Sequence, residues 1–215
     1  PKSQARHGLT QLLRQSPGGR RRRRRRDRSS RFTGIQNITP IEQRPAEVDL
    51  RLLPGHWEGD LVKGAKGQSC IATLVERYSR LTLLLPLRSG SASELRLALV
   101  RRLRSLPPEL RRSLTYDRGT EMAQHLELSA QLNMPVFFCQ PYSPWQRGTN
   151  ENTNGLIRQY LPKGLDLSTI TDQELQQIER ALNTRPRRIL GFRTPQEALD
   201  AYCREHLDGV APLTC

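Results

Sequence analysis

Residues 54–62 have the sequence Pro-Gly-His-Trp-Glu-Gly-Asp-Leu-Val and predict a strand over residues 57–62. The pair Pro54-Gly55 disfavours earlier regular structure, and strand alternation places Glu58 and Asp60 on one face. Turn residues at 63–67 lead into a second strand over residues 70–75, and a tight turn at 78–80 leads into a third over residues 81–85. Three strands joined by short turns predict an antiparallel meander.

Beyond the meander, the hydrophobic pattern alternates between helices and short strands. A helix capped by Ser91 or Ser93 carries an apolar stripe that includes Leu95 and Leu99. Further helices are predicted over residues 121–132, 149–161 and 172–182, and further strands over residues 114–116 and 136–138. This order predicts an α/β domain in which a mixed sheet, antiparallel and parallel, has helices on both faces.

The charge of the chain is unevenly distributed. The 215 residues include 35 Lys and Arg against 21 Asp and Glu, a net charge of +14, and residues 1–45 hold 13 of the basic residues with two acids. A polyanionic partner is therefore favoured. Seven consecutive arginines predict an extended arm that grips a nucleic-acid backbone, with a solubilising tail as the alternative. They are Arg20, Arg21, Arg22, Arg23, Arg24, Arg25 and Arg26.

Composition predicts three segments: a basic, irregular arm over residues 1–43, a folded core over residues 44–205 and a tail over residues 206–215. No apolar run approaches the roughly 18 to 20 residues that cross a bilayer, which argues against a membrane protein. The four cysteines are widely spaced and do not suggest a disulfide framework, so a reducing cytoplasm is predicted. They are Cys70, Cys139, Cys203 and Cys215.

Three acidic residues lie where this fold would bring carboxylates together. Asp60 lies within the first strand, where a buried charge needs a neutralising partner. Asp117 ends the strand at 114–116, and Glu151 opens a helix after a loop rich in Pro and Gly. With divalent metal, such carboxylates form an oxygen-ligand site of the kind that Mg²⁺ prefers. Two ions in such a site activate an attacking hydroxyl and stabilise the leaving oxygen of a phosphodiester.

Each of these residues also has a structural interpretation. Asp117 is typical of a turn, and Glu151 is typical of a helix N-terminus, where it interacts with the helix dipole. Glu58 could replace Asp60 as the metal ligand from this strand, but it is the second choice. His56 and His125 are possible metal ligands, but a structural or supporting role is favoured for both.

Three motifs occur in order along the chain: Pro-Gly-His-Trp-Glu-Gly-Asp at 54–60, Tyr-Asp-Arg-Gly-Thr-Glu at 116–121, and Ser-Pro-Trp-Gln-Arg-Gly-Thr-Asn-Glu-Asn at 143–152. Together they closely resemble the catalytic domain of the IS-thirty family of insertion-sequence transposases. The resemblance extends from about Arg44 to Ala201. The 33 residues between Asp117 and Glu151 match the spacing of this family.

The resemblance implies a ribonuclease H-like fold and an Asp-Asp-Glu triad of Asp60, Asp117 and Glu151, which would serve as catalytic residues and as ligands of Mg²⁺ or Mn²⁺, with two ions. It implies DNA cleavage and strand transfer at insertion-sequence ends by direct transesterification, with water and then a DNA 3′-hydroxyl as nucleophile. A homo-oligomer on DNA is implied as well. The usual helix-turn-helix region is not expected in residues 1–43, so an inactive DNA-binding remnant stays open as an alternative, as does a structure-specific nuclease.

Further DNA contacts are predicted around this triad. Arg158 lies two helical turns after Glu151 on the same face, where it suits a phosphate. Trp145, Gln146 and Arg147 are predicted to contact a DNA end by stacking and backbone contact, although Trp145 is equally compatible with the core. Three asparagines either position the glutamate or touch DNA: Asn150, Asn152 and Asn154.

Overall fold

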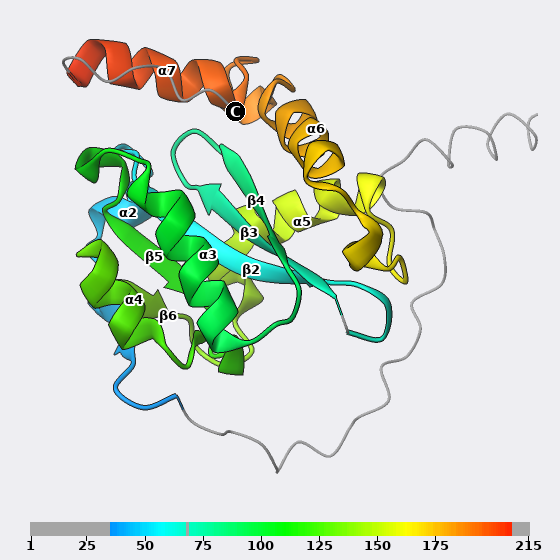
Figure 1. The fold of residues 1–215 in the computed structure, drawn as a ribbon. Coiled ribbons are helices and arrows are strands. Elements are labelled where there is room, and N and C mark those ends of the chain that lie inside the picture. Colours follow the sequence, from blue (N-terminus) through cyan, green and yellow to red (C-terminus); the bar gives the residue numbers. More distant parts are fainter. Residues whose placement is uncertain (1–34, 68, 208–215) are drawn as a thin grey trace, which may run out of the picture. The chain divides into compact units, whose positions relative to one another are not determined.

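The described residues of this computed structural model, 35–67 and 69–207, form a six-stranded sheet with helices packed against it (Figure 1). The strand order is β1-β6-β5-β2-β3-β4. The strands are β1 (Thr39–Pro40), β2 (His56–Lys63), β3 (Cys70–Glu76), β4 (Thr82–Leu87), β5 (Ser113–Tyr116) and β6 (Val136–Phe138). The α-helices are α2 (Glu47–Leu50), α3 (Ala92–Arg104), α4 (His125–Leu132), α5 (Gly148–Tyr160), α6 (Asp172–Asn183) and α7 (Pro195–His206).

The pairing of the strands confirms the predicted mixed sheet. β2, β3 and β4 pair antiparallel as a meander, whereas β2 pairs with β5, β5 with β6 and β6 with β1 in parallel. The predicted strand ends differ from the observed ones by two residues or fewer. Because β5 lies directly beside β2, the fourth predicted strand is a neighbour of the first. The end of β5 therefore lies beside the middle of β2, next to Asp60.

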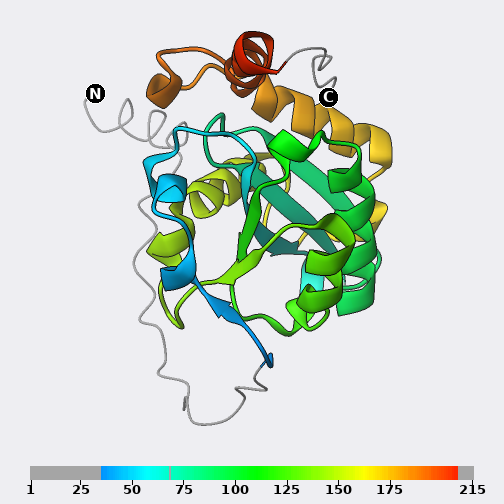
Figure 2. The same cartoon turned by 90° about the vertical axis from the view of Figure 1, so that its left-hand side faces the viewer.

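Two apolar cores confirm that helices cover both faces of the sheet (Figure 2). α3 and α4 pack on one face, where Trp57 is fully buried and its indole N–H donates to the carbonyl of Leu110 at 2.8 Å. α5 packs on the other face, against residues that include Val62 and Ile71. β2 contributes to both cores because its side chains alternate.

Helix α6 covers the outer edge of the sheet. The Glu179 carboxylate accepts a hydrogen bond from the backbone N–H of Leu84 at 2.6 Å. The Asn183 amide accepts from the N–H of Thr82 and donates to the carbonyl of the same residue, each at 2.8 Å. These contacts satisfy backbone groups of β4 that an edge strand otherwise exposes.

Several features of the fold, including the short helix α2, differ from the sequence-based expectation. The predicted helix at 121–132 is divided into a 3₁₀ turn, η4 (Thr120–Met122), and α4. α7 was not predicted, although Thr194 and Glu197 form a capping box that marks its start. Strand β1 lies within residues assigned to the arm, and His125 Nε2 lies 3.2 Å from the carbonyl oxygen of Asn37. Residues 35–43 thus pack on the domain, while residues 1–34, which include the seven arginines, lie outside the described residues.

Within the described chain, no helix is both long and apolar enough to cross a membrane. Cys70, Cys139 and Cys203 are free thiols, and all three are buried. Cys215 and the rest of the predicted tail from residue 208 lie outside the described residues.

Candidate active site

Asp60, within β2, and Asp117, directly after the end of β5, are brought together on neighbouring strands. The parallel register places Glu58 opposite Thr115, so two residues further along Asp60 is level with Asp117. One guanidinium group contacts both carboxylates: Arg147 lies 2.9 Å from Asp117 Oδ2 and 3.5 Å from Asp60 Oδ1. The same arginine donates to the carbonyl of Gly59 at 2.7 Å. The structure therefore confirms the predicted proximity of these two acids.

The carboxylate of Asp60 is held in one orientation. Its Oδ1 accepts from the N–H of Leu61 at 2.8 Å, and its Oδ2 accepts from the amide of Asn154 at 2.8 Å. Burial raises the pKa of Asp60, while the charge of Arg147 opposes that rise. Asp117 is more open, with 43% of its side chain exposed, and Oδ1 accepts from the N–H of Gly119. Both groups can thus be reached from solvent while their positions stay fixed.

Helix α5 lies along β2 and matches its spacing. Asn150 donates its backbone N–H to Glu58 at 2.9 Å, Asn154 contacts Asp60, and Arg158 donates to the carbonyl of Lys63 at 2.8 Å. Four helical residues rise about 6 Å and two strand residues about 6.6 Å, so the first two of these contacts meet alternate residues of β2, and the third reaches Lys63 at its end.

Glu151 lies in the first turn of α5, three residues before Asn154, and its side chain is exposed. Within residues 35–67 and 69–207, no three His, Cys, Asp or Glu side chains gather closely enough to hold a metal ion. The structure thus unites two of the three predicted acids and leaves Glu151 exposed in the first turn of α5. Its place in the triad stays a prediction.

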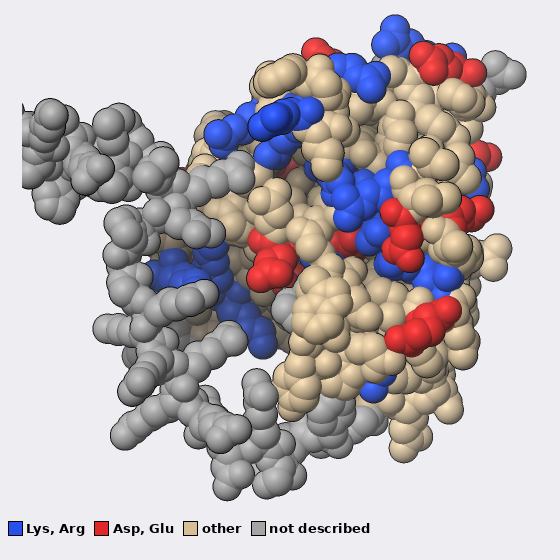
Figure 3. Space-filling model, turned by 180° about the vertical axis from the view of Figure 1, so that it is seen from behind, with Lys and Arg blue, Asp and Glu red and all other residues tan. Residues whose placement is uncertain are grey.

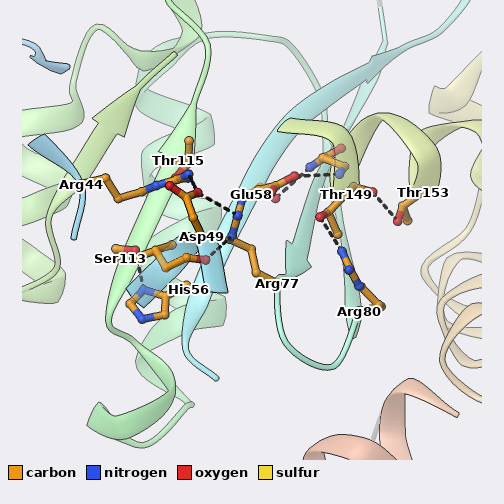
Figure 4. Close-up of polar contacts among 12 residues, drawn as sticks. Arg44, Asp49, His56, Glu58, Arg77, Arg80, Ser113, Thr115, Thr149 and Thr153 are labelled. Carbon is orange, nitrogen blue, oxygen red and sulfur yellow. Dashed lines mark hydrogen bonds and ion pairs between the residues drawn. The ribbon is translucent and has the colours of Figure 1, made fainter. Parts of the chain in front are cut away.

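Glu58 lies on the same strand face as Asp60, but its surroundings differ. Its side chain is fully buried, and it forms an ion pair with Arg77, whose side chain is 4% exposed. Arg77 also donates to the carbonyl of Val48 and pairs with Asp49 (Figure 4). Through Arg77, Glu58 joins β2 to the end of β3 and to α2. Through the backbone N–H of Asn150, it also joins β2 to α5. These contacts give Glu58 a structural role.

Both histidines have structural contacts. His56 is buried, and its Nδ1 lies 2.8 Å from the hydroxyl of Ser113. Burial, followed by the charge of Arg112, lowers the pKa of His56 to about 4, so this imidazole is neutral near pH 7. His125 contacts the carbonyl oxygens of Met122 and Asn37 and packs edge-on against Phe138. The favoured structural interpretation agrees with these contacts.

Glu121 was not among the predicted site residues. It lies in η4, and the charges of Asp117 and Asp60 act with burial to raise its pKa. Its carboxylate therefore belongs to the same electrostatic environment. Its sequence position could have identified Glu121 as a site residue, because it lies four residues after Asp117, on the turn that follows β5.

The predicted DNA contacts have distinct surroundings. Trp145 is 72% exposed, so the alternative that places it in the core is wrong. It lies in the 3₁₀ turn η5 (Pro144–Arg147), where the side chain of Gln146 accepts from the N–H of Gln140 at 2.7 Å. The guanidinium group of Arg158 donates to the carbonyls of Lys63 and Leu161. None of these contacts tests DNA binding, which stays a prediction.

Comparison with known proteins identifies relatives of this domain. Residues 53–144 match the family described as the integrase core domain. The chain is 48% identical over 200 residues to the transposase for insertion sequence element IS1086 of Cupriavidus metallidurans, and the match covers 93% of this chain and 58% of that protein. It is 50% identical over 199 residues to transposase InsI for insertion sequence element IS30C of Escherichia coli, covering 92% and 52%. The chain thus spans little more than half the length of these relatives.

Solved structures show the same fold at low sequence identity. The catalytic core domain of BIV integrase has a TM-score of 0.53 at 20% identity, covering 71% of this chain and 98% of that one. A chain in the simian T-cell lymphotropic virus intasome in complex with PP2A regulatory subunit B56 gamma has a TM-score of 0.56 at 19% identity, covering 76% and 59%. The described domain has the ribonuclease H-like fold of integrase catalytic cores, which confirms the predicted fold class.

Proposed function

The chain carries an integrase core domain and is a relative of the IS30-family transposases, and from that premise we propose that it cuts and joins DNA at the ends of an insertion sequence. Water first attacks a phosphodiester and releases a DNA 3′-hydroxyl. That hydroxyl then attacks a second phosphodiester in a direct transesterification, which displaces another 3′-hydroxyl as the leaving group. The observation that carries this proposal is the pair Asp60 and Asp117, held on neighbouring strands around one cationic group.

The acid pair fits a divalent metal. Its donors are carboxylate oxygens, the ligands that Mg²⁺ and Mn²⁺ prefer, and the guanidinium of Arg147 already lies between them as a cation. Asp60, Asp117 and Glu151 are the residues that would hold the metal, with two ions in the proposed enzyme. A bound pair of divalent ions supplies activation of the attacking hydroxyl and stabilisation of the leaving oxygen.

In this proposal, the remaining residues of the site orient the Asp60 carboxylate or bind DNA. Asn154 and the N–H of Leu61 fix the Asp60 carboxylate. Trp145 is exposed on the loop before α5, where its ring is available to stack on a base at a DNA end. Arg158 extends the same edge of α5 toward the end of β2. The working form in this proposal is a homo-oligomer assembled on DNA.

A strand-transfer assay tests the proposed function. The full chain is incubated with DNA that carries the ends of the neighbouring element, with Mg²⁺ or Mn²⁺ and with EDTA as the control. We expect nicked and joined products only with metal. Binding to DNA with neither product would contradict the proposal and support the alternative of an inactive remnant. Cleavage without joining would support the nuclease.

Replacing Arg147 tests its place between the two carboxylates. We expect Arg147→Gln to bind Mn²⁺ roughly tenfold more tightly, the equivalent of about 1.4 kcal/mol, because a competing positive charge has been removed. Titration calorimetry on the protein without DNA measures this affinity. Arg101→Gln is the matched control, since Arg101 is exposed on α3, on the other face of the sheet. Equal Mn²⁺ affinity in the two variants would show that Arg147 does not compete with metal.

Deleting residues 1–31 tests the arginine arm. The deletion removes 12 Lys and Arg but leaves the described domain intact, because that domain begins after residue 34. We expect weaker DNA binding and a flatter dependence of log Kd on log salt, by roughly 0.9 for each phosphate that the arm neutralises. Fluorescence anisotropy over a range of salt concentrations measures the slope. A slope equal to that of the full chain would mean that the arm does not grip the DNA backbone.

A further inference from the structure

A pocket lies at the first turn of α5, on a different face of this helix from the one that contacts Asp60. Its volume is about 300 Å³. Three of its eight lining residues are arginines, and the part of the chain that the structure describes contributes no Asp or Glu to it. The lining residues that matter here are Arg51, Arg80, Arg187, Thr149 and Asn152.

The three arginines come from separate segments of the chain. Arg51 follows α2, Arg80 lies in the turn between β3 and β4, and Arg187 precedes the 3₁₀ turn η7 (Arg188–Leu190). Arg51 and Arg80 have φ values of 55° and 67°, in the left-handed region that non-glycine residues adopt at a cost. The backbone is thus strained at two of the three arginines that line the pocket.

The Arg80 side chain is anchored at the wall of the pocket. The Arg80 guanidinium donates to the hydroxyl of Thr149 at 2.5 Å (Figure 4), and its Nε is buried with no hydrogen-bond partner among the described residues. Burial, followed by the charge of Arg51, lowers the pKa of Arg80 to about 10. Like charges gathered around a hollow without a facing carboxylate favour an anion that would accept from them.

We propose that this pocket binds a phosphate of the DNA backbone through Arg51, Arg80 and Arg187. The assignment rests on the proposed function, because it takes DNA as the source of the phosphate. Guanidinium groups pair with phosphate oxygens through parallel N–H donors.

The position of the pocket fits a strand that also reaches the acid pair. Thr149 and Asn152 face the pocket, whereas Asn150 and Asn154 face β2, so the first turn of α5 separates the two sites. The hollow continues into a neighbouring pocket of about 530 Å³, which shares Arg51 and Arg80 and adds Arg193. Figure 3 shows Lys and Arg gathered in several groups on the side of the molecule opposite the view of Figure 1. A DNA strand that crosses the start of α5 places one phosphate in the pocket and a nearby one beside Asp60.

DNA binding without catalysis tests this assignment. Anisotropy of a labelled duplex is measured with the full chain in EDTA over a range of NaCl concentrations. We expect Arg51→Gln and Arg80→Gln each to weaken binding about tenfold and to reduce the salt slope by roughly one. Arg101→Gln makes the same change of charge on the opposite face of the sheet and should leave the slope unchanged. Arg51→Gln keeps the hydrogen bond between Arg80 and Thr149, so it reports on binding even if Arg80→Gln unfolds.

Inorganic phosphate distinguishes a site for a DNA phosphate from a site for a small free anion. It should raise the thermal midpoint of the parent chain more than that of Arg51→Gln, because ligand bound to the folded state stabilises it. A slope that falls equally in all three variants, or in none, overturns the assignment. Phosphate stabilisation that depends on Arg51, combined with an unchanged DNA slope, also overturns it and indicates a small-anion site. No cleavage or joining occurs in EDTA, so failure here is distinct from failure of the strand-transfer assay.

Discussion

Asp60→Asn and Asp117→Asn should each abolish metal-dependent joining while DNA binding changes by less than a few-fold. Each substitution keeps the shape of the side chain but removes the negative charge that holds a cation. A loss of at least about 10³-fold in rate is expected, the equivalent of about 4 kcal/mol in the barrier. The two residues should behave alike because they contact the same guanidinium group from adjacent strands.

Glu151→Gln completes this series and tests the acid that the structure leaves exposed. A loss of joining rate as large as that of the two aspartate variants would place Glu151 in the triad. The substitution should leave the stability of the domain unchanged, because the side chain is at the surface. Glu127→Gln is the matched control, since Glu127 is 60% exposed on α4. Full joining activity in any one of the three acid variants would remove that residue from the proposed site.

Glu58→Ala should destabilise the domain by about 3–5 kcal/mol, because it leaves the buried guanidinium of Arg77 without its nearest carboxylate. It also removes the acceptor for the N–H of Asn150 at the start of α5. The thermal midpoint should fall by on the order of 10 °C. Urea unfolding measures the free energy directly, and Asp60→Asn should cost much less in the same assay.

A double-mutant cycle separates the ion pair from other effects of the substitution. Glu58→Met, Arg77→Met and the double variant should be non-additive, with the double variant more stable than the sum of the single losses predicts. If Glu58 were instead a metal ligand, Glu58→Gln would stay as stable as the parent chain and lose joining activity. That result would contradict the structural role.

Strand alternation and turn chemistry were sufficient to predict most of the sheet. The meander, the strand before Asp117 and the helix after the 141–148 loop all follow from local patterns, because turns and apolar periodicity act over a few residues. α7 and β1 were missed for different reasons. α7 carries a readable capping box, whereas β1 is a two-residue strand that exists only because β6 offers it a parallel edge.

The sequence by itself determined that Glu58 and Asp60 share a strand face and that Asp117 ends a strand, because both statements follow from a period of two and a strand end. Only the tertiary structure decided which of these two acids of β2, Glu58 or Asp60, has a structural role. Arg77 and the start of α5 enclose Glu58, whereas Asp60, two residues further along β2, lies beside Asp117 at the end of β5 and shares Arg147 with it. The arginine pocket likewise depends on tertiary structure, since residues 51, 80 and 187 meet only when the chain is folded.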